Sequence, residues 1–127
     1  MNKPKRLTGY KICEDGTHGP MHVGDTLDAM QEAIGGYFDV SIRYVGQEKR
    51  EYAIIFDGEG ILRGRDVTAI CLRYPALVGD LLILGIDNDV GDFKSLPNND
   101  LDYISKSLKM IQITNGSVIV RPVLEVL

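Results

Sequence analysis

Apolar residues recur along the chain with two different periods. Every second residue is apolar over 37–45, which is typical of a strand with one buried face. Residues 52–56 predict its antiparallel partner, residues 7–13 have strand character, and the unbroken apolar run at 81–86 predicts a strand buried on both faces. In the strand over 37–45, one face is expected to hold Phe38, Val40, Ile42 and Tyr44.

Two segments have the helical period instead. Residues 26–34 predict a helix that Asp25 caps and that Gly35 ends, with an apolar stripe of Leu27, Met30 and Ile34. A second helix is expected to start at residues 97–100, with a stripe of Leu101, Ile104 and Leu108. Residues 61–75 are compatible with either a short helix or a loop.

The end of the chain predicts a β-hairpin. Asn115-Gly116 separates two β-prone segments, and this dipeptide favours the turn that joins two antiparallel strands. Pro122 cannot donate a backbone hydrogen bond and is expected at an edge or a strand end. The apolar last residues, 123–127, favour packing against another surface.

These elements predict an α+β fold: a single, mainly antiparallel sheet with two helices and a C-terminal β-hairpin extension. We expect a core domain over residues 1–109. The extension over residues 110–127 is expected to be the contact between copies in a homodimer or higher oligomer.

Composition narrows the function classes. The 127 residues are 44% hydrophobic and 25% charged, with 14 basic against 18 acidic residues and a net charge of −4. This excess of acid argues against duplex nucleic acid or an anionic membrane as the main partner. Two cysteines, Cys13 and Cys71, and the lack of an apolar leader segment favour the reducing cytoplasm.

The chain carries no recognisable catalytic motif. Its only histidines are His18 and His22, and neither stands in a nucleophile or zinc-hydrolase pattern, so we expect no enzyme activity and no cofactor. Three acidic residues in one loop, Asp87, Asp89 and Asp92, leave open a weak metal-dependent phosphodiesterase. A turn closed by its own Asp side chains explains that loop more simply, and we predict no metal site.

Arginines offer a better candidate site. Two guanidinium groups flank Gly64, which lets the backbone approach a phosphate while both groups hold its oxygens. An aromatic residue ahead of a helix can stack on a base or fill the core, and an asparagine there can bind a ligand or cap the helix. The candidate ligand-binding residues are Arg43, Arg63, Arg65, Phe93, Asn98 and Arg121, with solvated surface arginines as the alternative.

Three segments together resemble a known family. They are Val23-Gly24-Asp25-Thr26-Leu27-Asp28-Ala29-Met30-Gln31-Glu32-Ala33-Ile34-Gly35-Gly36-Tyr37, Val78-Gly79-Asp80-Leu81-Leu82-Ile83-Leu84-Gly85 and Gly91-Asp92-Phe93-Lys94-Ser95-Leu96. In this order they resemble the phage- and plasmid-borne family called domain of unknown function 3846. The resemblance implies a fold and an origin in mobile elements, and it implies no activity.

The chain is also similar to the phage anti-Thoeris sponge family in size, in Phe93 ahead of a helix and in Arg121 near the end of a C-terminal β extension. That resemblance implies an oligomer that sequesters cyclic ADP-ribose isomers or cyclic oligonucleotides without breaking a bond. We therefore expect a small nucleotide-derived ligand and further copies of the chain as partners. The alternatives are a protein-binding inhibitor encoded by a mobile element and the weak phosphodiesterase.

Overall fold

The structure is a computed structural model. It describes residues 6–13, 15, 17–36, 38–45, 51–57, 59, 64, 67–71, 77–87, 92–107, 109–114 and 118–124. The described part contains two helices and a mainly antiparallel strand arrangement, which confirms the predicted α+β class.

The main sheet is antiparallel throughout its pairings. Its strands lie in the order β2-β1-β7-β4-β3, and the short β8 pairs with β7 beside β1. Their bounds are β1 (Arg6–Ile12), β2 (His18–Gly24), β3 (Phe38–Val45), β4 (Glu51–Asp57), β7 (Leu81–Ile86) and β8 (Phe93–Lys94).

A second sheet takes the remaining strands in the order β6-β5-β10-β9. Their bounds are β5 (Val67–Cys71), β6 (Leu77–Val78), β9 (Lys109–Thr114) and β10 (Val118–Leu124). The hairpin of β9 and β10 is present, and β10 also runs parallel to β5. The hairpin pairs with β5 and not with the main sheet, so the described strands form a second sheet in addition to the mainly antiparallel one that was expected.

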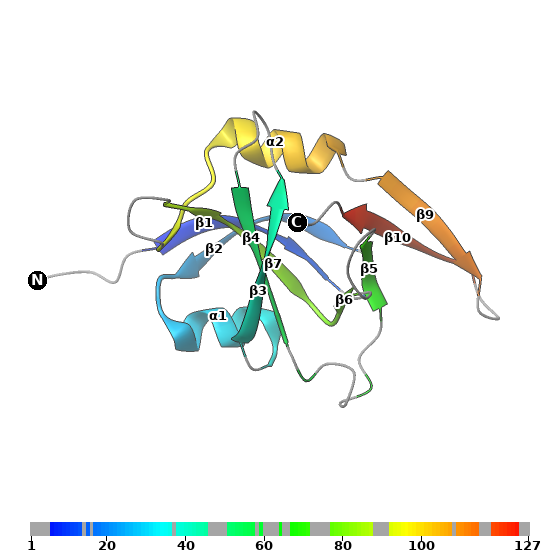
Figure 1. Cartoon of the computed structure of the whole chain (residues 1–127), viewed down its shortest axis with the longest axis horizontal. Helices are drawn as coiled ribbons and strands as arrows, with labels where there is room; N and C mark the ends of the chain where they lie inside the picture. The colour runs from blue at the N-terminus through cyan, green and yellow to red at the C-terminus, as the bar shows by residue number, and fades with distance from the viewer. Residues whose placement is uncertain are drawn as a thin grey trace, which may run out of the picture.

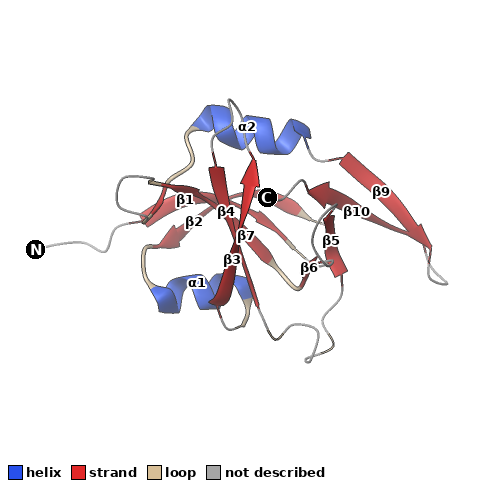
Figure 2. Ribbon diagram, in the orientation of Figure 1, coloured by secondary structure: helices blue, strands red, loops and turns tan. Residues whose placement is uncertain are grey.

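The two helices cover opposite faces of the main sheet, α1 (Leu27–Ile34) on one side and α2 (Asn98–Ser107) on the other (Figure 1; Figure 2). The central strand β7 shows why, because its alternate residues enter different cores. Leu81 and Ile83 pack on the α2 side, whereas Leu82 and Leu84 pack on the α1 side. All four are fully buried, as the apolar run predicted.

Each core is formed by one helix and the facing residues of the sheet. The α2-side core contains Tyr10, Ile12, Tyr52, Ile54, Phe56, Leu81, Ile83, Leu96, Leu101 and Ile104. The α1-side core contains Leu7, Val23, Met30, Ile34, Ile55, Leu82 and Leu84.

The first helix begins at Leu27, one residue later than expected, and its cap is displaced by the same one residue. Thr26, not Asp25, is the N-cap: its hydroxyl oxygen accepts a hydrogen bond from the Ala29 backbone N–H at 3.1 Å. Gly35 ends the helix in the left-handed conformation at φ 67°, as predicted, and its N–H binds the Gln31 and Glu32 carbonyls.

Four strand features differ from the sequence expectations. Residues 18–24, for which no strand was expected, form β2, and residues 67–71 form β5, neither helix nor loop. In β3, the register passes from Phe38 opposite Asp57 to Val40 opposite Phe56, so one residue is bulged. Phe38 therefore does not continue the alternation of the following residues. Pro122 is opposite Met110 within the β9–β10 pairing, directly before the residues of β10 that pair with β5, so the prediction that it lies at an edge or a strand end is wrong.

Candidate functional site

Polar side chains join β1 to the exposed face of β2. The Tyr10 hydroxyl and the His18 Nδ1 lie 2.5 Å apart, and the two rings are 5.8 Å apart between centroids. One step along the hairpin, Thr8 Oγ1 and His22 Nδ1 are 3.1 Å apart. Tyr10 is buried and both histidines are exposed, so each histidine closes a polar contact at the rim of the α2-side core.

Thr8 also binds the segment that leads into α2. Its backbone N–H donates to Ser95 Oγ at 3.0 Å, and its carbonyl accepts from the Leu96 N–H at 2.8 Å. These bonds bring the beginning of β1 and the beginning of α2 together, although they are almost ninety positions apart in sequence. Asn98, the first residue of α2, is exposed close to this junction.

A buried polar pair anchors the same helix to the centre of the sheet. The Tyr52 hydroxyl donates to the Asp100 carboxylate at 2.6 Å, with Tyr52 1% and Asp100 2% exposed. A hydrogen bond to a charged group in so buried a position is stronger than one between neutral groups. The pair fixes the first turn of α2 over β4.

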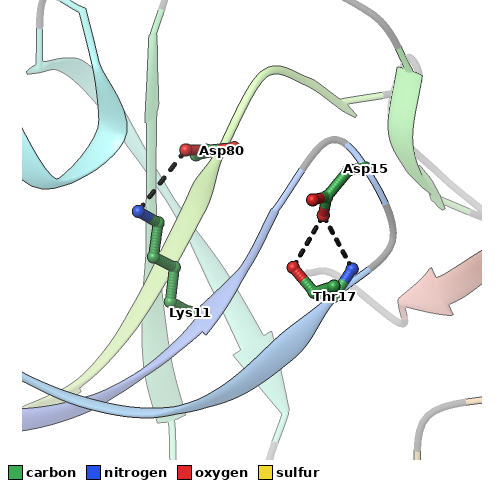
Figure 3. A network of polar contacts seen from close by, with 4 residues as sticks. All are labelled: Lys11, Asp15, Thr17 and Asp80. Atoms are coloured by element: carbon green, nitrogen blue, oxygen red, sulfur yellow. Dashed lines mark hydrogen bonds and ion pairs between the residues drawn. The ribbon is translucent and has the colours of Figure 1, made fainter.

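The loop between β1 and β2 is held by its own side chains (Figure 3). Asp15 Oδ1 accepts from both the backbone N–H and the hydroxyl of Thr17, at 2.9 and 2.6 Å. Nearby, Lys11 Nζ and Asp80 Oδ2 form an ion pair at 3.4 Å. The Asp15–Thr17 bonds have the geometry of a closed turn. The Lys11–Asp80 pair is a surface contact in which the ammonium group is already paired with a carboxylate.

The carboxylate of Asp57 lies at the junction of α1 and β4. Asp57 is 1% exposed, and its Oδ1 accepts from the Glu59 N–H at 2.9 Å, which closes the predicted turn after β4. On the other side it packs against the backbone of Gly36, directly after the α1 cap.

The predicted ligand residues are distributed over the fold. Arg43 lies on β3 opposite Ala53, in the main sheet, whereas Arg121 lies on β10 opposite Ile111, in the second sheet. Phe93 is half-buried and packs against the α1-side core. Arg63 and Arg65 lie outside the described residues.

Of these six residues, Phe93 lies in β8 and Asn98 begins α2, whereas Arg43 and Arg121 belong to different sheets. Phe93 has the packing role that was one of its two predicted readings. A site that uses both described arginines of one chain would have to span the two sheets.

The described residues contain no group of three or more His, Cys, Asp and Glu side chains that could hold a metal. In the acidic loop, the Asp87 N–H donates to the Asp92 carbonyl at 2.8 Å, which closes the turn through its backbone. Asp89 lies outside the described residues. Neither helix of the described chain is long and apolar enough to cross a membrane.

Tyr10, Tyr52 and Asp100 form polar contacts on the α2 side, and none of the three was expected to do so. A signal was available. A tyrosine at an inward position of a strand needs a hydrogen-bond partner for its hydroxyl, and polar residues at a helix start are the natural candidates.

The elements from β2 through α1 and β7 to α2 lie within the part of the chain that matches a known family. A model described as domain of unknown function (DUF3846) matches residues 8–109. The chain belongs to that family. All three segments on which the resemblance was based fall inside the match, and the β10 strand falls outside it. No curated protein and no solved structure matched significantly.

Membership in this family identifies relatives of the chain, and it does not identify an activity. The similarity to the sponge family stays a prediction, since the comparisons do not bear on it.

Proposed function

We propose that this protein binds a nucleotide-derived signal, a cyclic ADP-ribose isomer or a cyclic oligonucleotide, and holds it intact. In this proposal the protein is phage-encoded, acts in the cytoplasm of the bacterial host, and counters anti-phage defence by removing the signal. The observation that carries the proposal is the position of Arg121 in the C-terminal hairpin, one strand from the outer edge of the second sheet.

That position supports a site completed by a second copy. Arg121 is opposite Ile111 of β9, and β9 is the outermost strand of the described second sheet. If two copies meet along β9 with Ile111 of one copy opposite Ile111 of the other, their Arg121 positions lie about 14 Å apart, three interstrand spacings. Two arginines approaching from opposite sides are suited to a ligand that carries more than one phosphate.

The charge balance is compatible with a small ligand and not with a polyanion. A net charge of −4 supplies no long-range attraction, so affinity must come from local contacts. Each charge-assisted hydrogen bond from a guanidinium group contributes about 1.5–3 kcal/mol, and a few of them give tight retention.

The test is recovery of the ligand. Purified protein is incubated with cyclic ADP-ribose isomers or cyclic oligonucleotides, freed of unbound ligand by gel filtration, and denatured by heat. Mass spectrometry of the supernatant should then find the intact ligand. A cleaved product would favour the phosphodiesterase, and absence of any retained nucleotide would favour the protein-binding inhibitor.

The predicted effect of Arg121→Ala is ligand retention about tenfold to a hundredfold weaker, since one guanidinium group and its hydrogen bonds are lost. Stability should change little. The matched control is Arg6→Ala, which removes the same charge from an exposed position at the start of β1. Equal retention by the two variants would remove Arg121 from the site.

A further inference from the structure

The outer strands of the two sheets differ in how well they can pair with another strand. β2 carries Pro20 at its centre, and proline removes a backbone donor from an edge. β6 has two residues. β3 has eight residues and no proline, and among the strands that the structure describes only β4 pairs with it. It is the longest outer strand, and its outer side is unpaired within the described chain.

The sequence of β3 has a two-fold pattern about Ser41. On either side of Ser41 stand two β-branched residues, then an acid and a base, then two aromatic residues. The equivalent positions are Val40 and Ile42, Asp39 and Arg43, Phe38 and Tyr44. The other outer strands have no such pattern, because neither β9 (KMIQIT) nor β2 (HGPMHVG) contains an acidic residue.

We propose that the outer edge of β3 pairs antiparallel with the same edge of a second copy, in a register centred on Ser41. In that register Asp39 of each copy is opposite Arg43 of the other, and the pair occurs twice because of the two-fold axis. Val40 is opposite Ile42. Opposite charges and β-branched residues directly across an antiparallel pair are both stabilising.

The arrangement inside one copy suits this pairing. Val40 and Ile42 are opposite Phe56 and Ile54, two residues of the α2-side core. When two copies pair, these apolar positions of one main sheet therefore continue into the equivalent positions of the other. The bulge lies between Phe38 and Val40, and the register leaves Asp39 with no partner position on β4. The ladder between copies thus spans positions 39–43 and ends where the strand bends.

The pairing does not depend on the ligand, and it assigns Arg43 to the contact between copies. It leaves the C-terminal hairpin free for the ligand site, since β3 and β10 belong to different sheets.

Charge exchange tests the register. Asp39→Arg places two arginines across from each other, and Arg43→Asp places two aspartates across from each other. By light scattering, each single variant should form an assembly of at most half the wild-type mass. The dissociation constant of the contact between copies should be at least tenfold higher than in the wild type. An equimolar mixture of the two variants should recover the wild-type mass, because every mixed pair again joins arginine to aspartate. The double variant D39R/R43D should recover it alone.

A mixture that stays as small as its components, or single variants with the wild-type mass, would overturn the proposal. So would a wild-type protein that is monomeric at micromolar concentration. Hydrogen exchange on the unmodified chain gives a second measurement without any substitution. Exchange over residues 39–43 should rise on dilution, whereas exchange over the central strand β7 should not. If β3 exchanges equally at all concentrations, the edge is not an interface.

Discussion

At the residue scale, the contact between Tyr52 and Asp100 shows how one polar pair secures an element. Asp100 is a buried carboxylate in the first turn of α2, where negative charge also suits the helix dipole. The Tyr52 hydroxyl reaches it from β4. The cost of removing one partner includes the desolvation of the other, which stays buried.

We therefore expect Tyr52→Phe to lower the free energy of unfolding by about 1.5–3 kcal/mol, the range for hydrogen bonds to charged groups. Urea denaturation measures the change. The control is Tyr103→Phe, which deletes the same atom from a half-buried tyrosine that packs against the α2-side core. If both variants lose the same stability, the bond to Asp100 has no special contribution.

Sequence predicts such residues only in part. The unbroken apolar run of β7 identified residues that are buried, and Leu81 to Leu84 are indeed all inside. It could not identify the partner of a buried hydroxyl, because Tyr52 and Asp100 are brought together by packing of a helix on a sheet. The same holds for Thr8, whose partners Ser95 and Leu96 come from a distant segment.

At the element scale, the end of α1 and the end of β4 are fitted closely together. A Cβ atom added at Gly36 would lie 2.2 Å from Asp57 Oδ2 and 2.9 Å from Asp57 Cβ. Asp57 is 1% exposed, so its side chain has little room to move away. The glycine is needed here for close approach and not for its backbone conformation.

Gly36→Ala should accordingly destabilise the fold by about 1–3 kcal/mol, the usual cost of overpacking. Thermal or urea unfolding checks this. Gly19→Ala is the matched control, since a Cβ at Gly19 meets no atom within 4 Å, and we expect a change within about 0.5 kcal/mol. A well-tolerated Gly36→Ala would mean that α1 can shift away from β4.

Local sequence signals predicted the elements whose start and end are marked by capping or terminating residues. The helix over 26–34 has a cap, an apolar stripe and a terminal glycine, and it forms as expected apart from the exact capping residue. β2 and β5 were not predicted. β2 contains Gly19 and Pro20, which favour turns, and it becomes a strand because β1 supplies seven paired positions. β5 becomes one through its pairing with β6 and β10.

At the scale of the whole molecule, the sequence pattern could not predict which strands belong to which sheet. Periodicity shows that a strand has a buried face, and it does not show which strand lies beside it. The parallel pairing of Val123 with Ile70 and of Leu124 with Cys71 joins the two ends of a long chain segment. The candidate ligand residues show the same limit, since nothing in the pattern around Arg43 and Arg121 indicates that they lie in different sheets.

This topology predicts that the C-terminal extension can be removed at the expense of one sheet. β10 is the only described strand that joins β9 to β5, whereas the main sheet takes no strand from residues 110–127. In a chain truncated after Asn115, amide hydrogen exchange over β5 should become fast, because its parallel partner is gone. Exchange over β1, β4 and β7 should stay slow, because their pairings and both helix-covered cores are retained. Fast exchange throughout the truncated chain would instead show that the two sheets fold as one cooperative unit, and that residues 1–109 do not form a domain of their own.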